Sequence, residues 1–180
     1  LIILLIICTF SVSKYHLRFN EERKFNELEG VDLSKAIDAK VLSNEFKGLQ
    51  WITYRYPDDP NRELNNLKQI IKILKNDSSK RMLITDYQFL SPTLNTYDFS
   101  PNQWHHPTVS FPLNDQKYFK KYKNFFIKNL KNNNIDFIYE TTENDKSITE
   151  LVINKDCLKK IRASEMLLKI KLLKNCKDLN

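Results

Sequence analysis

Glycine is almost absent from this chain: its 180 residues include only Gly30 and Gly48. A P-loop and a Rossmann fingerprint both need several clustered glycines, because backbone N–H groups must approach the phosphates closely. Two isolated glycines exclude both motifs, and with them the nucleotide binders that are easiest to detect in a sequence. We therefore predict no cofactor.

Cysteine is also scarce, with Cys8 near the start and Cys157 and Cys176 near the end. Neither of the last two has a second ligand at the short spacing of a zinc site, so no metal is predicted. The two lie 19 residues apart and could close a disulfide outside the cytoplasm. Such a bridge would contribute about 3 kcal/mol. Two unrelated buried thiols are the alternative.

Acidic residues are fewer than basic ones, 22 against 29, which gives a formal net charge of +7. Most of the excess is lysine in expected helices and tails. The simplest interpretation is a solvated helix face, and contact with lipid or an anionic glycan is the alternative. Nucleic-acid binding is not predicted. The helix-face lysines are Lys117, Lys120, Lys121, Lys128 and Lys131.

Residues 1–12 form an apolar run, and no charge occurs before Lys14. A bilayer-spanning helix needs about 20 apolar residues. We therefore expect residues 1–13 to be the C-terminal part of a transmembrane helix that begins upstream. A signal-peptide core and a buried core helix are the alternatives, but a run that is apolar on every face suits lipid better. Residues 14–30 would then connect the membrane to a soluble domain at 31–180.

Two features disagree about the side of the membrane on which this domain lies. Lys14, Arg18, Arg23 and Lys24 follow the apolar run, and the positive-inside rule would place them in the cytoplasm. The predicted disulfide instead favours an extracytoplasmic domain.

The hydrophobic pattern alternates between strand and helix periods. Residues 48–54 and 135–139 are typical of strands, and 82–85 of a strand buried on both faces. A helix after Asp59-Pro60 and another at 115–132 lie between them. This order predicts an α/β fold with a mostly parallel sheet flanked by helices. The buried face of the second helix would hold Phe119, Tyr122, Phe125, Phe126 and Leu130.

The last third of the chain gives weaker patterns. Residues 148–153 are consistent with a strand and 155–161 with the start of a helix. Residues 166–173 are apolar enough for either state.

Aromatic and polar side chains follow the first two predicted strands. Ligands of open α/β sheets bind beyond the carboxyl ends of the strands. Aromatic rings beside carboxylate and amide groups suit a sugar, which offers both an apolar face and hydroxyls. Alternatively, Tyr87 and Trp104 belong to the core and Asp86 caps a turn. The candidate ligand-binding residues are Tyr54, Arg55, Asp86, Tyr87, Gln88, Trp104, His105 and His106.

His105 and His106 are adjacent, so on a strand their rings would point to opposite faces and could not share one metal ion. A single histidine with Asp86 as its orienting carboxylate would resemble a general base, but no nucleophile accompanies it. We predict no catalytic residue in this chain.

The apolar start, the strand at 48–54 followed by Tyr56-Pro57, and the segment RMLITDYQF at 81–89 together resemble a known family. They are similar in layout, over residues 1–150, to the C-terminal soluble region of bacterial polytopic GT-C-type glycosyltransferases. These membrane enzymes use lipid-phosphosugars and are related to protein mannosyltransferases.

This resemblance implies an inner-membrane parent whose soluble domain is periplasmic and recognises a glycan or a lipid-linked sugar acceptor. The family's catalytic acidic residues lie in an early loop upstream of this sequence, so none is carried over. The alternative is a non-enzymatic interaction or assembly domain of an envelope protein.

Overall fold

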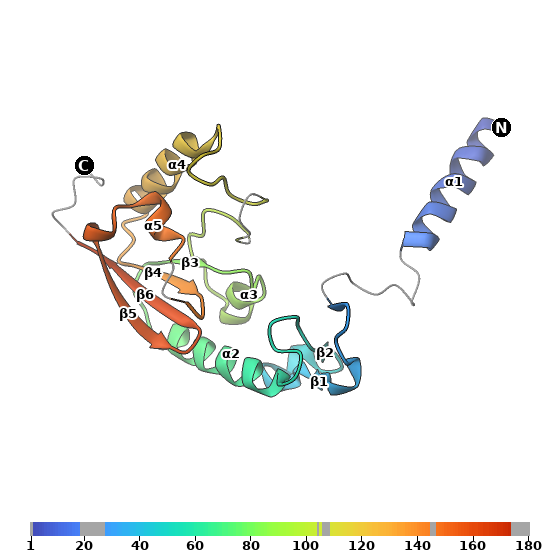
Figure 1. Ribbon diagram of the computed structural model, residues 1–180, viewed down its shortest axis with the longest axis horizontal. Coiled ribbons are helices and arrows are strands. Elements are labelled where there is room, and N and C mark those ends of the chain that lie inside the picture. The colour runs from blue at the N-terminus through green and yellow to red at the C-terminus, as the bar shows by residue number, and fades with distance from the viewer. Residues whose placement is uncertain (1, 19–27, 104, 106–108, 145–146, 174–180) are drawn as a thin grey trace.

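A computed structural model of the chain describes residues 2–18, 28–103, 105, 109–144 and 147–173. Helix α1 (Ile2–Arg18) comes first, and a mixed α/β domain follows (Figure 1). Three single-turn 3-10 helices and a small sheet open this domain. They are η2 (Leu33–Lys35), β1 (Ile37–Asp38), η3 (Ala39–Val41), η4 (Asn44–Phe46) and β2 (Gln50–Trp51).

The centre of the domain is a four-stranded sheet in the order β3-β4-β6-β5. β3 (Arg81–Ile84) and β4 (Phe137–Thr141) run parallel, whereas β6 (Leu167–Leu172) is antiparallel to both β4 and β5 (Leu158–Ser164). The α/β class is therefore confirmed, but the expectation of a mostly parallel sheet is wrong. β5 and β6 are joined by two residues, and so short a connection permits only antiparallel pairing.

Two predicted strands do not enter this sheet. Within 48–54 only β2 is a strand, and it pairs with β1 in a separate two-stranded sheet. Residues 148–153 contain a short helix, α5 (Thr149–Val152), instead of a strand. The backbone N–H groups of Ile148 and Thr149 donate to the Glu140 carboxylate, and this local capping competes with strand pairing. The 3-10 helix η5 (Lys155–Cys157) leads directly into β5.

Helices cover both faces of the four-stranded sheet (Figure 1). α2 (Pro60–Lys75) and α3 (Leu90–Leu94) pack on one face, and α4 (Phe119–Asn132) and α5 on the other. Along β3, Leu83 belongs to the α2 cluster, and Met82 and Ile84 belong to the α4 cluster. This alternation confirms the prediction of a strand buried on both faces.

Helix α2 begins where the sequence predicts. The Asp59 side chain accepts a hydrogen bond from the backbone N–H of Arg62 (3.1 Å), and Pro60 occupies the first turn, where it displaces no hydrogen bond. The predicted apolar face is confirmed and is buried in the core. It comprises Leu64, Leu67, Ile70, Ile71 and Leu74.

Helix α4 differs from its prediction in its start, which is Phe119 instead of residue 115, and in the width of its buried face. Phe126 and Leu130 are buried as expected, and Phe119 and Tyr122 are half-buried. Phe125 is 52% exposed, so its predicted burial is wrong. The buried face of the helix is therefore narrow: Phe126 and Leu130 lie in the core, and Tyr122 packs against it.

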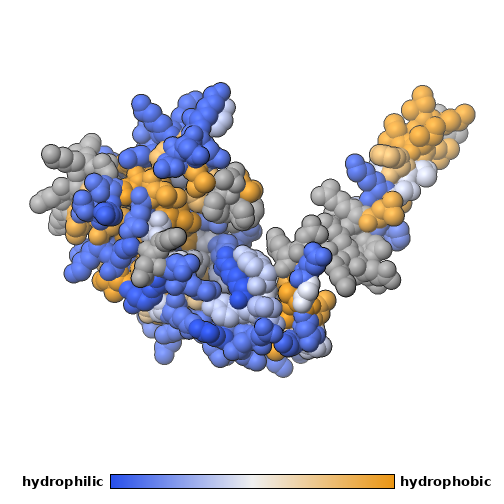
Figure 2. Space-filling view, viewed as in Figure 1, coloured by the Kyte–Doolittle hydropathy of each residue, from blue (hydrophilic) through white to orange (hydrophobic). Residues whose placement is uncertain are grey.

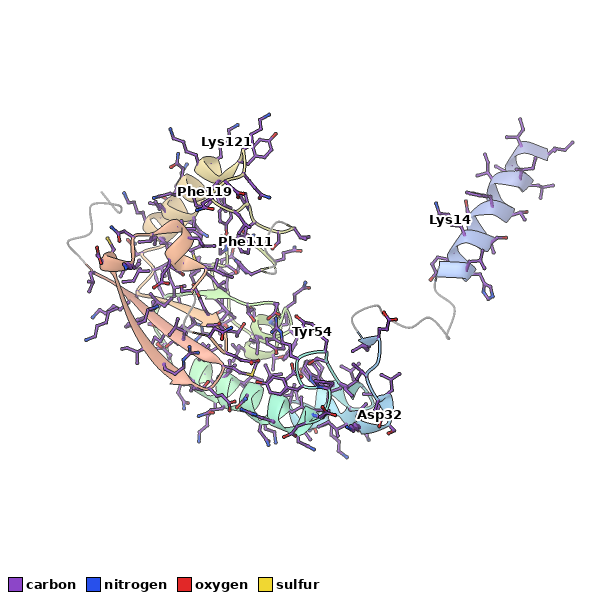
Figure 3. The ribbon with its side chains drawn as sticks, in the orientation of Figure 1. Lys14, Asp32, Tyr54, Phe111, Phe119 and Lys121 are labelled. Carbon is purple, nitrogen blue, oxygen red and sulfur yellow. The ribbon has the colours of Figure 1, made fainter. Side chains whose placement is uncertain are left out.

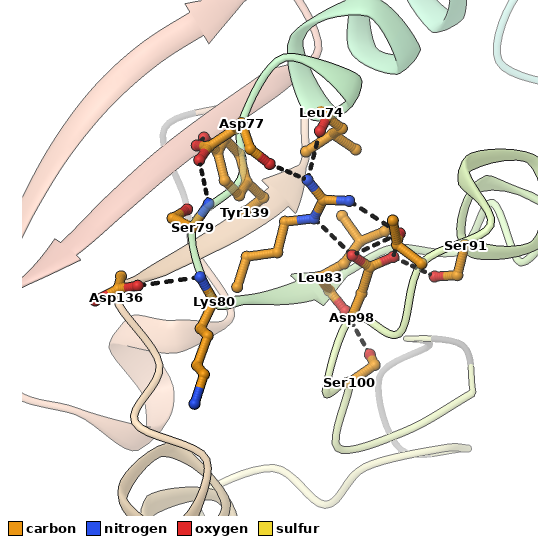
Figure 4. Close-up of polar contacts among 12 residues, drawn as sticks. Leu74, Asp77, Ser79, Lys80, Leu83, Ser91, Asp98, Ser100, Asp136 and Tyr139 are labelled. Carbon is orange, nitrogen blue, oxygen red and sulfur yellow. Dashed lines mark hydrogen bonds and ion pairs between the residues drawn. The ribbon is translucent and has the colours of Figure 1, made fainter.

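A buried ion pair fastens the chain after α3 to the sheet (Figure 4). Arg81 on β3 donates from Nε to Asp98 Oδ1 (2.6 Å), and the side chains are 5% and 1% exposed. The same guanidinium donates to the Leu74 and Asp77 carbonyls at the end of α2. Ser91 donates its hydroxyl to the second oxygen of Asp98 (2.7 Å). The pair thus joins β3, α2 and α3.

Helix α1 is apolar around its circumference, and its large side chains are exposed. Ile2 is 73% exposed and Ile7 57%. Figure 2 shows this apolar surface toward the N-terminal end of the helix. Within the described ranges, no helix is both long and apolar enough to cross a membrane. The transmembrane assignment of residues 1–13, and the domain boundaries that follow from it, stay predictions.

The predicted disulfide also stays a prediction. Cys157 ends η5 and is half-buried, and Cys176 lies outside the described residues. Cys8 is a free, exposed thiol on α1.

Candidate ligand-binding cleft

Two adjoining cavities open at the carboxyl ends of the parallel strands β3 and β4. The smaller has a volume of about 140 Å³ and the larger about 440 Å³, and both are lined by Arg55, Thr141 and Thr142. We call them together the carboxyl-end cleft. The smaller cavity is also lined by Ile84, Thr85, Asp86, His105, Glu140 and Ile148, and the larger by Tyr54, Glu143, Asn144 and Met166.

Arg55 lies between the two cavities and organises the cleft. Its guanidinium forms an ion pair with Asp86, and the two side chains are 32% and 28% exposed. The Nε group donates to Tyr54 Oη (3.2 Å), and the guanidinium carbon lies 5.5 Å from the Tyr54 ring centre. Tyr54 itself is 56% exposed, where the segment after β2 approaches the main sheet (Figure 3). An exposed aromatic ring therefore stands beside a paired donor and acceptor.

A buried carboxylate, Glu63, accepts hydrogen bonds from residues that are close in sequence to Arg55 and to Asp86. Glu63 on α2 is fully buried and accepts hydrogen bonds from Trp51 Nε1 (2.9 Å), Thr53 Oγ1 (2.8 Å) and Tyr87 Oη (2.7 Å). Burial and the Glu63 carboxylate raise the pKa of Tyr87, although Arg55 acts in the opposite direction. Tyr87 is therefore a neutral donor and part of the core. Glu63 fixes the small sheet, and with it Arg55, against the four-stranded sheet.

His105 is the polar group of the smaller cavity whose bonding is incomplete. It is 7% exposed, and among the residues that the structure describes neither of its ring nitrogens has a partner that meets hydrogen-bond geometry. Burial lowers the pKa of His105 to about 4, although the Thr85 backbone and the Asp86 carboxylate act in the opposite direction. The ring is therefore neutral at pH 7 and offers one donor and one acceptor. A buried imidazole without partners is costly unless a ligand or water satisfies it.

Glu140 lines the same cavity but is already committed to the fold. It is 2% exposed and accepts hydrogen bonds from the Ser147 hydroxyl (2.8 Å) and from the backbone N–H groups of Ile148 (3.0 Å) and Thr149 (2.8 Å). Burial raises the pKa of Glu140, and these hydrogen bonds oppose that shift. Its oxygens cap the start of α5 and are not available to a ligand.

The rim of the larger cavity is held by β5. Arg162 donates to the Thr142 carbonyl (2.6 Å) and to the Asn144 carbonyl (2.9 Å). These bonds hold the backbone of Thr142 and Asn144 in place, and with it the positions of their side chains at the rim of the cavity.

The structure brings five of the eight predicted ligand-binding residues together. Tyr54, Arg55, Asp86 and His105 line the cleft. Tyr87 does not line it but accepts a hydrogen bond from Arg55. Two features differ from the sequence-based hypotheses. Asp86 pairs with Arg55 instead of orienting His105, and the turn after β3 is capped by Thr85, whose hydroxyl accepts from the Tyr87 backbone N–H (3.0 Å).

The other three predicted residues are Gln88, Trp104 and His106. Gln88 lines a separate cavity of about 600 Å³. Trp104 and His106 lie outside the described residues. We favour the carboxyl-end cleft over the 600 Å³ cavity, because the polar groups that line the 600 Å³ cavity are largely bonded within the fold. Those groups include Ser91 and Asp98 of the buried ion-pair network and Asn102, which donates to the Ser110 carbonyl.

Sequence reasoning missed the contribution of β4. Thr141, Thr142 and Asn144 follow the third predicted strand, and the rule that placed Asp86 at the carboxyl edge applies equally to them. Glu63 was missed as well, because a charged residue on a helix carries no sign in the sequence that it is buried.

Neither metal chemistry nor a known relative guides the assignment of this cleft. Among the residues that the structure describes, no group of three or more His, Cys, Asp or Glu side chains could hold a metal ion. Comparison with known proteins found no match: no family model, curated protein or solved structure is significantly similar to this chain.

Proposed function

We propose that the domain at 31–180 recognises a neutral saccharide in the carboxyl-end cleft, as the extracytoplasmic domain of a membrane-anchored glycosyltransferase. One observation carries the proposal of a ligand site. In a cavity that also holds the Arg55–Asp86 pair, the buried neutral imidazole of His105 finds no partner of hydrogen-bond geometry among the described residues.

The chemistry of the cleft supports a saccharide as the ligand. The exposed ring of Tyr54 can stack on the apolar face of a sugar. Arg55 and Asp86 neutralise each other, and His105 is uncharged at pH 7, so the smaller cavity provides donors and acceptors in balance. The larger cavity, at about 440 Å³, lies within the range of about 300–1,000 Å³ that small-molecule sites occupy.

The hydrogen bonding supports recognition instead of catalysis. Glu63 and Glu140 are both buried, and their oxygens are occupied by protein donors. Asp86 is paired with Arg55. A general acid or base needs a carboxyl that can exchange a proton with the substrate, and the buried Glu63 and Glu140 are held by the fold instead.

Membrane attachment through α1 is the second part of the proposal. The helix exposes apolar side chains on all sides, which is costly in water and favourable in lipid. The family resemblance supplies the glycosyltransferase parent, its extracytoplasmic orientation and the glycan or lipid-linked acceptor as the class of ligand.

Saturation-transfer NMR tests the saccharide proposal. The full chain is mixed with a panel of neutral methyl glycosides, namely methyl α-mannoside, methyl β-glucoside and methyl β-galactoside. We expect transfer to at least one of them, with loss of the signal in Asp86→Asn because Arg55 is then unpaired and a carboxylate acceptor is missing.

Asp58→Asn is the matched control, because Asp58 is 84% exposed and does not line the cleft. This variant should bind like the unmodified chain. If no glycoside receives saturation, or if both variants lose binding equally, the saccharide assignment fails. A domain that binds only proteins would give no saturation transfer to any glycoside.

A further inference from the structure

The outer face of α4 carries a dense positive charge that no acidic residue interrupts. Six lysines occur between positions 117 and 131, and residues 116–135 contain no Asp or Glu. Lys117, Lys121 and Lys128 are exposed. Lys121 and Lys128 are two turns apart on one side of the helix, and Lys117 lies in the turn just before its first residue. Figure 3 shows Lys121 on the side of α4 that faces away from the sheet.

Large aromatic side chains are exposed among these lysines. Tyr118 is 58% exposed and Phe125 is 52% exposed. Tyr118, the N-cap residue, is three residues before Lys121 and Phe125 is four residues after it, and these spacings put both on its side of the helix. A solvated helix face has no reason to hold Phe125, because a ring in water costs free energy that burial would recover.

Helix α2 provides an internal comparison. Its outer face carries three exposed lysines, Lys68, Lys72 and Lys75, at a similar spacing. None of the large exposed apolar side chains of the described residues belongs to α2. Lysine density alone therefore does not explain the aromatic side chains on α4.

We propose that the basic-aromatic face of α4, comprising Lys117, Tyr118, Lys121, Phe125 and Lys128, docks on the anionic headgroups of a membrane. Lysine side chains are attracted electrostatically to an anionic lipid surface and need no complementary binding pocket. Aromatic rings are enriched at the level of the lipid headgroups. The opposite side of α4 is packed into the core through Phe126 and Leu130, so the helix rests on the surface and does not enter the bilayer. This proposal stands on residues distinct from the saccharide cleft.

Lysine acetylation footprinting of the full chain tests the proposal. The chain is mixed with vesicles of pure phosphatidylcholine, or with vesicles containing 30% phosphatidylglycerol, and the acetylation rate of each lysine is read by mass spectrometry. We expect the anionic vesicles to slow acetylation of Lys117, Lys121 and Lys128 by about fivefold or more relative to the neutral vesicles. Lys68, Lys72 and Lys75 should change by less than about twofold, and salt at about 1 M should abolish the difference.

Each other outcome overturns the proposal. Equal rates on both vesicle types would mean that α4 does not contact the lipid, whether or not α1 inserts. Equal slowing on α2 and α4 would mean adsorption by net charge alone. Equally strong protection by a single-stranded oligonucleotide without vesicles would point to nucleic acid. None of these results depends on saccharide binding, because the vesicles contain no sugar.

Discussion

Substitution of Asp98 by Asn removes one charge from the buried ion pair that joins β3, α2 and α3. The change is nearly isosteric, so the packing around position 98 is kept. Arg81 stays 4% exposed and loses the carboxylate that compensates its charge. The variant therefore isolates the electrostatic contribution of the pair from its contribution to packing.

The loss of unfolding free energy depends on the hydrogen bonds that Arg81 retains in the variant. Removing one partner of a buried ion pair costs about 3–5 kcal/mol, because the other charge is left uncompensated in a medium of low dielectric constant. Arg81 retains hydrogen bonds to the Leu74 and Asp77 carbonyls and to the Thr96 hydroxyl. These bonds limit the loss, so we expect a cost near the lower bound, about 3 kcal/mol, or roughly a 150-fold change in the folding equilibrium constant.

Urea unfolding followed by tryptophan fluorescence measures this cost. Trp51 on β2 donates to Glu63 on α2, so its emission changes when the small sheet separates from this helix on unfolding. The transition midpoint should fall in Asp98→Asn with an unchanged slope. Asp58→Asn is the same substitution in the exposed Lys35–Asp58 pair and should leave the midpoint unchanged. A cost below about 1 kcal/mol for Asp98→Asn would refute the assignment of a buried, structurally essential pair.

Two further predictions concern the pH dependence and the core. Despite the opposing effect of burial, hydrogen bonds from Lys169, Ser79 and Tyr139 hold the pKa of Asp77 well below its usual range. Its stabilisation is therefore complete above the unfolded-state pKa of about 4 and is lost as pH falls toward the lower native pKa. Between pH 5 and 2 the urea midpoint should fall less in Asp77→Asn than in the unmodified chain; parallel curves would contradict this. In thermal unfolding, Phe126→Ala should cost about 3–5 kcal/mol and Phe125→Ala less than about 1, since only Phe126 is fully buried. Similar losses at both positions would contradict the orientation of α4.

The sequence patterns predicted the parts of the fold in which local signals agree with tertiary packing. Helix α2 has a cap, a proline in its first turn and an apolar face of constant spacing, and all three occur in the structure. The second strand was recognisable as an uninterrupted apolar run. The sheet topology was not predictable, because the pairing of β6 with β4 depends on a short turn after β5 and on long-range contacts.

The position of the candidate cleft could be predicted from the sequence, but the hydrogen bonds and ion pairs of its residues could not. The rule that ligands lie at the carboxyl ends of strands placed Asp86 at this edge. Arg55 reaches the same edge and pairs with Asp86, although the strand before it belongs to the separate two-stranded sheet. The rule does not say which carboxylates become buried and saturated, as Glu63 and Glu140 are. Nor could it show that His105 is left without partners, since that depends on the three-dimensional neighbours of its ring.

Direct observation of the His105 ring during a glycoside titration tests the central claim of ligand recognition most closely. Long-range ¹H–¹⁵N correlation spectra report separately on the two ring nitrogens, for which the described residues offer no partner of hydrogen-bond geometry. We predict that the methyl glycoside identified by saturation transfer shifts at least one of these nitrogen signals in the unmodified chain and not in Asp86→Asn. Saturable binding that leaves both nitrogen signals of His105 unmoved would contradict the account.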